Sequence, residues 1–212
     1  MKVKQQLADI WDRQHSCPSG IVGWLVSEQM VRQHRPETIW TIDLLDIQPT
    51  DRVLEVGFGA GQGIKLSAAK AYEGYVTGID LSEDMVRVAR RRNAQSVRAG
   101  RVVLAQGSII ALPFADQQFD KIMTIHTVYF WSEASQAFNE LYRVLKSAGR
   151  VVITLCTGKI NEQGEIEVWA SFQSILEERV IPGMQRAGFK AVRQERGPDS
   201  RQYTNVAVIA EK

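Results

Sequence analysis

Two acidic residues and three glycines are the part of the sequence whose types and spacing indicate chemistry. Residues 53–61 read Val-Leu-Glu-Val-Gly-Phe-Gly-Ala-Gly, so Glu55 lies two positions before the first glycine. A second short apolar run ends at Asp80, 23 positions after Gly57. Glycines let the backbone turn sharply and let a ligand come close. A carboxylate after the next strand can accept hydrogen bonds from ribose hydroxyls. The pattern predicts a site for a nucleoside-containing cofactor.

These residues must be positioned by alternating strands and helices. Strands are predicted at 52–56, 74–79, 101–105, 119–125, 149–155, 189–195 and 203–210. Helices are predicted at 61–71, 82–94, 133–146, 166–178 and 182–187. Such alternation indicates a parallel sheet with helices on both faces. Only a short connection joins the last two strands, so that pair must be antiparallel. We expect an α/β fold with a doubly wound, seven-stranded, mainly parallel sheet whose last strand is antiparallel.

The N-terminal region has a different pattern. Pro18-Ser19-Gly20 interrupts the chain, and Pro36 is suited to the first turn of a helix. The residues after Pro36 are apolar nearly all round, which is typical of a buried or covered helix. We therefore expect residues 1–48 to form an N-terminal helical cap, and residues 49–212 to form the cofactor-binding domain.

The composition is that of an ordinary globular protein. The chain has 212 residues, 44% of them hydrophobic and 24% charged, with a net charge of +2. Cys17 and Cys156 form no CxxC pair, so neither a disulfide framework nor a metal site is expected. No signal peptide or membrane-spanning run is evident. The arginines near residues 87–92 suit a solvated helix face. We expect a cytoplasmic protein with no nucleic-acid or membrane partner.

A nicotinamide dinucleotide is the first alternative cofactor, and two details count against it. The dinucleotide fingerprint has glycine at its sixth position, where this chain has Gln62. Glu55 would also place negative charge near a pyrophosphate. A carboxylate is better tolerated beside a ligand that carries an ammonium and a sulfonium, which favours S-adenosylmethionine (SAM).

Four ordered motifs over half of the chain carry a family resemblance. They are residues 53–61, residues 78–85 (Gly-Ile-Asp-Leu-Ser-Glu-Asp-Met), residues 111–120 (Ala-Leu-Pro-Phe-Ala-Asp-Gln-Gln-Phe-Asp) and residues 140–146 (Glu-Leu-Tyr-Arg-Val-Leu-Lys). Residues 53–153 resemble the core of the class I, Rossmann-like SAM-dependent methyltransferases, and are most similar to the small-molecule methyltransferase type 11 group.

The resemblance implies roles for particular residues. The residues around the methionine part of SAM would be Glu55, Gly57, Gly59 and Gly61, with Phe58 at the bend. Asp80 would bind the ribose, and Leu81 would flank the adenine, on which Met85 could also pack. Members of the family often have an aspartate after Gly107, facing the adenine amino group. Here that residue is Ser108, whose hydroxyl could still hydrogen-bond, together with the N–H of Ile109.

Methyl transfer from a sulfonium is an in-line displacement that depends mainly on alignment in a dry site. His126, after the fourth strand, is a candidate general base, because an imidazole titrates near neutrality. It could instead line the cofactor cleft through its backbone. The aromatic residues Tyr129, Phe130 and Trp131 could wall an acceptor pocket or pack in the core. His15 and His34 are expected to be surface residues or local hydrogen-bond partners.

The sequence thus predicts an enzyme that moves a methyl group from SAM to a small-molecule acceptor at O, N or C and leaves S-adenosylhomocysteine (SAH). An NAD(P)-dependent oxidoreductase and a SAM-binding module without turnover are the alternatives. The acceptor pocket is expected to use Trp11, Trp24 and Trp40 from the cap, with residues 157–167 closing the other side. A homodimer is compatible with the sequence, which does not fix the oligomeric state.

Overall fold

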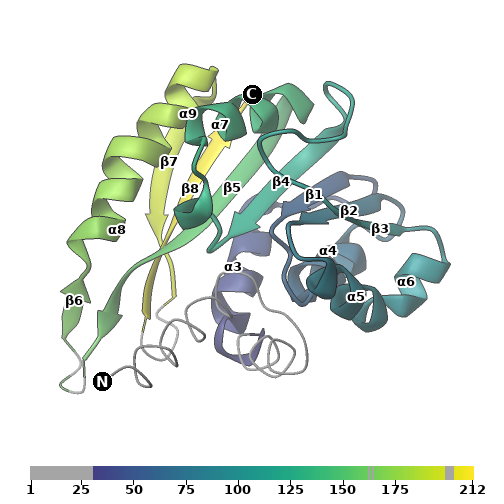
Figure 1. Cartoon of the computed structure of the whole chain (residues 1–212), viewed down its shortest axis with the longest axis horizontal. Coiled ribbons are helices and arrows are strands. Elements are labelled where there is room, and N and C mark those ends of the chain that lie inside the picture. The colour runs from purple at the N-terminus through teal and green to yellow at the C-terminus, as the bar shows by residue number, and fades with distance from the viewer. Residues whose placement is uncertain (1–30, 162, 164, 199–202) are drawn as a thin grey trace, which may run out of the picture.

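The computed structural model describes residues 31–161, 163, 165–198 and 203–212. One eight-stranded sheet runs through them, with the order β3-β2-β1-β4-β5-β8-β7 and with β6 added beside β5 (Figure 1). The strands are β1 (Arg52–Val56), β2 (Tyr75–Asp80), β3 (Val102–Gln106), β4 (Phe119–Ile125), β5 (Leu145–Ile160), β6 (Ile166–Val168), β7 (Lys190–Arg196) and β8 (Tyr203–Glu211).

Helices cover both faces of this sheet. They are α3 (Arg35–Leu45), α4 (Gln62–Lys70), α5 (Glu83–Arg92), α6 (Ala94–Arg98), the 3₁₀ turn η1 (Val128–Phe130), α7 (Ala134–Val144), α8 (Ala170–Ser174), the π-helical η2 (Ile175–Val180) and α9 (Ile181–Ala187). One apolar cluster joins a face of the sheet to α7, η2 and α9. A second joins the opposite face to α3, α4 and α5. The predicted doubly wound α/β architecture is therefore confirmed.

The parallel strands bring the predicted site residues to one edge of the sheet. β1 pairs in parallel with β2 and β4, so that Val56 lies opposite both Ile79 and Thr124. The three strands end at or within one residue of these positions, so that Gly57, Asp80 and His126 all lie at strand ends. The carboxyl ends of parallel strands are where ligands bind in such sheets. The pairing register of the strands therefore brings together residues that are distant in the sequence.

The C-terminal strands match the predicted arrangement. β8 runs antiparallel to both β5 and β7. The strand count differs from the prediction, because the sheet has eight strands instead of seven. The additional strand is β6, whose Gly158↔Val168 and Ile160↔Ile166 pairs extend β5 into a hairpin. The predicted loop at 157–167 is therefore mostly hairpin.

The helix predicted at 166–178 is wrong in its first turn. Residues 166–168 are a strand, and the helix starts only at Ala170. The short helix predicted at 182–187 is present as α9, but the gap predicted between it and the preceding helix is absent, because the backbone stays helical at both Val180 and Ile181. Proline lacks an N–H and collides with a carbonyl four residues earlier in a regular α-helix. In this chain the wider π-helical turn of η2 ends two residues before Pro182.

The helix predicted after Pro36 forms, but its buried side is unexpectedly polar. Ile42 and Leu45 are buried as expected, together with Glu37, Thr38 and Thr41, whereas the side chain of Ile39 is 40% exposed. Thr41 Oγ1 donates to the carbonyl of Glu37 and lies 2.6 Å from Thr154 Oγ1 of β5. This contact attaches α3 to β5, a central strand of the sheet. Most of the predicted cap, including Trp11, Trp24 and His15, lies outside the described residues.

Two further features concern the apolar character of the helices and the arginines of α5. Within the described ranges, no helix combines the length and apolar character that crossing a membrane requires. Arg87, Arg90 and Arg91 of α5 are exposed, as expected of a solvated helix face. Its Arg87 pairs with Glu83 and Asp84, while Arg90 donates to the carbonyl of Leu104.

Candidate active site

A tight turn between β1 and α4 forms the floor of the site. Gly57, Gly59 and Gly61 all have positive φ angles, of 72°, 51° and 79°. A Cβ at Gly57 would lie 2.3 Å from Thr127 Cγ2, and one at Gly61 would lie 2.6 Å from the Cβ of Ala89. At Gly59, by contrast, a Cβ would meet nothing within 4 Å. The middle glycine therefore faces open space, where a ligand can approach the backbone.

Glu55 lies beneath this turn with its carboxylate in the protein interior. Its side chain accepts a hydrogen bond from the backbone N–H of Ile64, in the first turn of α4. Its second oxygen, Oε2, is buried without a hydrogen-bond partner in the described part of the chain. Burial, reinforced by the nearby charge of Asp80, raises the pKa of Glu55 to about 8. A buried acceptor without a donor is costly, and a cationic ligand group would relieve that cost.

Asp80 lies across the turn, at the end of β2. One carboxylate oxygen accepts the N–H of Gly59 at 2.8 Å, and the other accepts the N–H of Ser82 at 2.9 Å. These bonds fix the carboxylate against the glycine turn. Burial raises the pKa of Asp80, and the two N–H donors oppose that rise. Each oxygen retains acceptor capacity for a hydroxyl donor.

The other residues predicted to bind the cofactor lie in different environments. Leu81 is 64% exposed, so its side chain is free to cover a ligand. Met85 and Phe58 are instead buried in the apolar cluster beneath α4 and α5, at 1% and 4% exposure. Ile109 is also buried, and Ser108 Oγ accepts a long hydrogen bond from the N–H of Ile110 at 3.4 Å. Their contacts with a cofactor remain predictions.

His126 follows β4 in an unusual backbone conformation, with a φ angle of 56°. Its backbone N–H donates to the carbonyl of Thr154 at 2.9 Å. Its Nε2 lies 3.4 Å from Oε1 of Glu37, a fully buried carboxylate on α3. His34 Nδ1 lies 2.6 Å from the same oxygen, and the two imidazole rings are 4.7 Å apart. His34 is thus a local hydrogen-bond partner, as expected.

The charges of this cluster are set by burial and hydrogen bonds. Burial opposes ionisation of Glu37, but hydrogen bonds from His126 and His34 outweigh it and lower its pKa to about 2. Burial lowers the pKa of His126, against the hydrogen bond to Glu37. The cluster therefore presents an ionised carboxylate beside a neutral imidazole at neutral pH.

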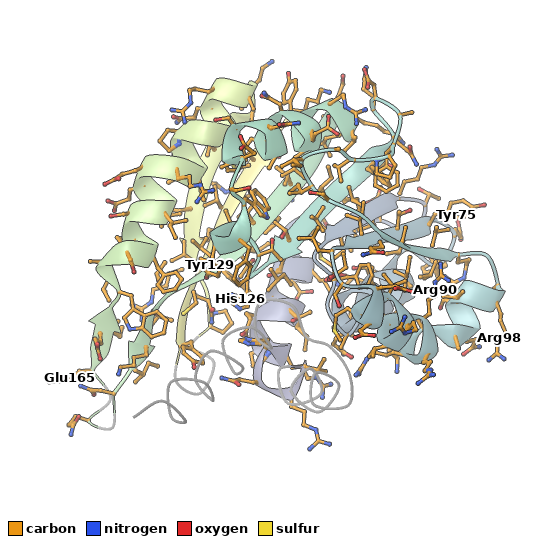
Figure 2. All side chains as sticks on the ribbon, in the orientation of Figure 1. Tyr75, Arg90, Arg98, His126, Tyr129 and Glu165 are labelled. Carbon is orange, nitrogen blue, oxygen red and sulfur yellow. The ribbon has the colours of Figure 1, made fainter. Side chains whose placement is uncertain are left out.

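Tyr129 lies close to His126 where β4 ends (Figure 2). Its hydroxyl donates to the carbonyl of Cys156 at 3.1 Å and accepts the N–H of Cys156. β5 extends beyond the end of β4 at this point, so Cys156 has no partner residue on β4. The Tyr129 hydroxyl takes the place of that partner. Burial raises the pKa of Tyr129, which keeps the phenol protonated. The ring, and not the hydroxyl, is therefore available to a ligand.

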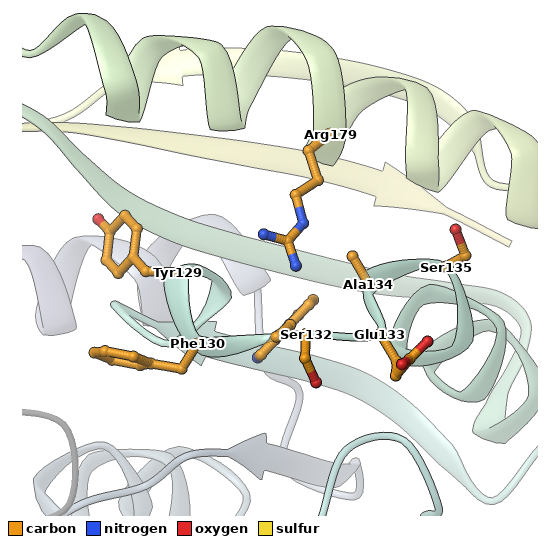
Figure 3. Close-up of a pocket in the computed structure, with 8 residues that line it drawn as sticks. Tyr129, Phe130, Ser132, Glu133, Ala134, Ser135 and Arg179 are labelled. Carbon is orange, nitrogen blue, oxygen red and sulfur yellow. The ribbon is translucent and has the colours of Figure 1, made fainter.

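A cavity of about 580 Å³ opens next to this ring, between the 128–135 segment and η2. Aromatic, hydroxyl and charged side chains line it: Tyr129, Phe130, Trp131, Ser132, Glu133, Ala134, Ser135 and Arg179. Arg179 extends from η2 toward the opposite wall (Figure 3). Phe130 is 55% exposed, whereas Trp131 is 5% exposed and packs against Phe138 in the core. All three aromatic residues thus line the cavity, and Trp131 also belongs to the core.

The comparisons with known proteins agree with this geometry. A family model described as a methyltransferase domain matches residues 54–153. Uncharacterized methyltransferase YdaC of Bacillus subtilis is 32% identical over 126 residues, which are 59% of this chain and 67% of YdaC. The ubiquinone/menaquinone biosynthesis C-methyltransferase UbiE of Geotalea daltonii is 37% identical over 50% of this chain and 45% of its own length. The chain thus spans less than half of that relative.

Solved structures share the fold. A SAM-dependent methyltransferase from Aquifex aeolicus aligns with a TM-score of 0.66 and 21% identity, over 85% of this chain and 92% of its own. The [4+2]-cyclase SpnF aligns with a TM-score of 0.67 and 18% identity, over 83% and 80% of the two chains.

Fold, site and relatives together define a class I SAM-dependent methyltransferase. The chain belongs to the methyltransferase family that YdaC represents, and its cofactor is SAM. The predicted resemblance is therefore confirmed. The oxygen of Glu55 that is buried without a partner in the described ranges, and the open approach to Gly59, both suit a ligand that carries an ammonium and a sulfonium.

Proposed function

We propose that this protein transfers the methyl group of SAM to a small-molecule acceptor at an oxygen, nitrogen or carbon atom. The observation that carries the proposal is the pair of carboxylates on the two sides of the glycine turn. Glu55 offers a buried oxygen that has no donor among the described residues, and Asp80 is held against Gly59. A cation and a sugar with two hydroxyls are the ligand groups that such a pair recognises.

The roles of the chain's own residues follow from their places around the turn. Glu55 would bind the methionine end of the cofactor, and Asp80 would orient its ribose. SAM would supply an electrophilic methyl group for in-line displacement, in which position and exclusion of water provide most of the acceleration. Thr127 packs on Gly57, so the 126–131 segment borders the turn and is suited to hold an acceptor. That His126 removes a proton from the acceptor remains a prediction.

The cavity beside Tyr129 is the proposed acceptor pocket. Its aromatic wall favours a partly apolar molecule, and the UbiE relative is named for C-methylation in quinone biosynthesis. Arg179 adds a cationic group to the pocket, which favours an acceptor with an electron-rich or anionic substituent. Residues 1–30 are also expected to contribute, and their part is outside the described structure.

Binding and turnover test the proposal separately. Calorimetric titration of the full chain should show binding of SAH and no binding of NADH. Incubation with methyl-labelled SAM and a metabolite extract should transfer label to an acceptor, and Phe130→Ala should reduce this transfer without weakening SAH binding. Binding of NADH in preference to SAH would overturn the proposal. Binding of SAH with no transfer to any acceptor would favour a SAM-binding module. A homodimer and a cytoplasmic location remain predictions.

A further inference from the structure

We propose that His34, Glu37 and His126 form a binding site for one divalent transition-metal ion, for which Zn²⁺ is the probe. The three side chains come from the start of α3 and the end of β4. One potential ligand atom from each lies within 4.8 Å of the others. Two imidazoles and one carboxylate with an open position form a donor set that zinc enzymes use for catalysis.

The distances are close to those of a bound ion. Zinc bonds of about 2.0–2.2 Å at tetrahedral angles place two ligand atoms about 3.4 Å apart. His126 Nε2 is 3.4 Å from Glu37 Oε1. His34 Nδ1 is closer, at 2.6 Å, and would have to withdraw to admit the ion. His34 lies just before the first residue of α3, and its side chain is 24% exposed, so this adjustment meets little obstruction.

The fold holds the carboxylate and the second imidazole in place without a metal. Thr154 of β5 anchors both elements, because its hydroxyl contacts Thr41 of α3 and its carbonyl accepts the N–H of His126. The positive φ of His126 is uncommon for a residue with a side chain. Such strain persists only where the surroundings impose it, and it gathers at functional sites. The cluster is therefore built into the structure.

Access also suits a metal. Glu37 lies fully buried at the base of the cluster, whereas the side chains of His34 and His126 are 24% and 16% exposed. An ion can thus enter between the imidazoles, and its open position would face outward.

A catalytic use of this ion in methyl transfer rests on the proposed function, whereas binding of the ion by the three side chains does not. Thr127, next to His126, packs against the glycine turn, so the ion would be close to the bound cofactor. An acceptor hydroxyl or thiol bound to the ion would release its proton to solvent more readily. The acceptor's lone pair would then bond to the methyl carbon as the carbon–sulfur bond breaks and its electrons return to sulfur. SAH and the methylated acceptor are the products.

Metal binding by the full chain tests the proposal directly. The protein is stripped with a chelator and titrated with Zn²⁺ in competition with a chromogenic chelator, and with Co²⁺ for its absorption spectrum. We expect one Zn²⁺ per chain and the visible bands of a four-coordinate Co²⁺ site. Glu37→Gln and His126→Asn should each weaken Zn²⁺ binding more than about tenfold, which is about 1.4 kcal/mol. Asparagine is chosen because it tolerates a positive φ.

Glu195→Gln is the matched control, because Glu195 is an exposed carboxylate near Arg193 on β7. Its Zn²⁺ affinity should equal that of the wild type. If Glu37→Gln does not fold, His34→Gln and the wild-type Co²⁺ spectrum decide the question. Zn²⁺ affinity that is unchanged in the ligand variants, or a wild-type chain that binds no Zn²⁺, would overturn the site.

Calorimetry with SAH on the stripped protein separates this proposal from the proposed function. Loss of SAH binding with intact Zn²⁺ binding would contradict the methyltransferase function alone. Intact SAH binding with no Zn²⁺ binding would contradict the metal site alone.

Discussion

Gly63 leaves the space that the carboxylate of Glu55 occupies. A Cβ at Gly63 would lie 2.3 Å from Glu55 Oε1, far inside van der Waals contact. Gly63 is in the first turn of α4 and has no positive φ, so its backbone does not require glycine. Glycine is needed at position 63 because a side chain there would collide with the buried carboxylate of Glu55. The fourth glycine of this region is thus linked to that carboxylate.

Gly63→Ala should therefore displace the Glu55 carboxylate. We expect SAH affinity to fall at least about tenfold, equivalent to about 1.4 kcal/mol, with a loss of folding stability of about 1–3 kcal/mol from overpacking. Calorimetry and denaturant unfolding measure the two effects. Ser67→Ala on the same helix is the control, because Ser67 Oγ is buried without a partner in the described ranges. It should keep SAH affinity and should not lose stability. Unchanged SAH affinity in Gly63→Ala would contradict the role of Glu55.

The raised pKa of Glu55 predicts a pH-dependent stability of the ligand-free protein. Between the model-peptide value of 4.5 and about 8, the folded protein keeps a proton that the unfolded chain has lost. The free energy of unfolding should therefore decrease as pH rises through this window, by an amount on the order of a few kcal/mol. Glu55→Gln resembles the protonated form and should flatten the slope. Denaturant unfolding at several pH values between 5 and about 9 measures it. Equal slopes in the two proteins would show that Glu55 is not the group responsible.

Binding of SAM should change the protonation of the same residue. A ligand with a positive charge near Glu55 favours the ionised carboxylate. At pH 7 we therefore expect SAM binding to release protons, and Glu55→Gln to abolish the release. Calorimetry in buffers with different ionisation enthalpies detects it, and buffer-independent heats for the wild type would contradict it.

Gly59 and Gly61 should differ when each is replaced with alanine. Both have positive φ, so each substitution strains the backbone by about 1 kcal/mol or more. At Gly61 the new methyl group also collides with Ala89 and Asn93, which adds a loss of stability. At Gly59 it enters the open space instead. We expect Gly61→Ala to be the less stable protein and Gly59→Ala to show the larger loss of SAH affinity. The reverse order would place the ligand elsewhere.

Tyr129→Phe should affect stability more than cofactor binding. The hydroxyl is the partner of the N–H and carbonyl of Cys156, and its loss leaves them without that partner at a cost of about 1–3 kcal/mol. SAH affinity should remain within about twofold, because the ring is retained. Tyr72→Phe is the control, since Tyr72 is 57% exposed and should change stability by less than about 0.5 kcal/mol. A stability unchanged in Tyr129→Phe would contradict the structural role of the hydroxyl.

The features that the sequence predicted correctly are local patterns. The turn after β1, the end of β2 at Asp80 and the start of α5 can be read from short stretches, because each depends on neighbours within a few residues. The parallel pairing of the strands follows from their alternation with helices. The antiparallel β7–β8 pair follows from a short connection.

The features that were missed depend on distant contacts. Glu37 and His126 are separated by 89 positions, and nothing near Glu37 indicates that α3 buries its polar side. A buried glutamate that is followed by two buried threonines on the same helix has no apolar periodic signature. β6 was missed because its three residues are exposed and pair only with the end of β5.

The π-helical turn of η2 has a consequence for how this protein family could diversify. Such a turn holds one residue more than an α-helix needs over the same length. Deleting one residue from the Ile175–Val180 segment would let it relax to an ordinary α-helix over the same length, so the turns on either side would keep their orientation and only side chains inside the segment would change direction. Arg179 would then no longer be aimed at the cavity. Deletion of a single residue can thus redirect the Arg179 guanidinium and change which acceptor molecules the cavity binds. Every strand of the sheet would stay in register.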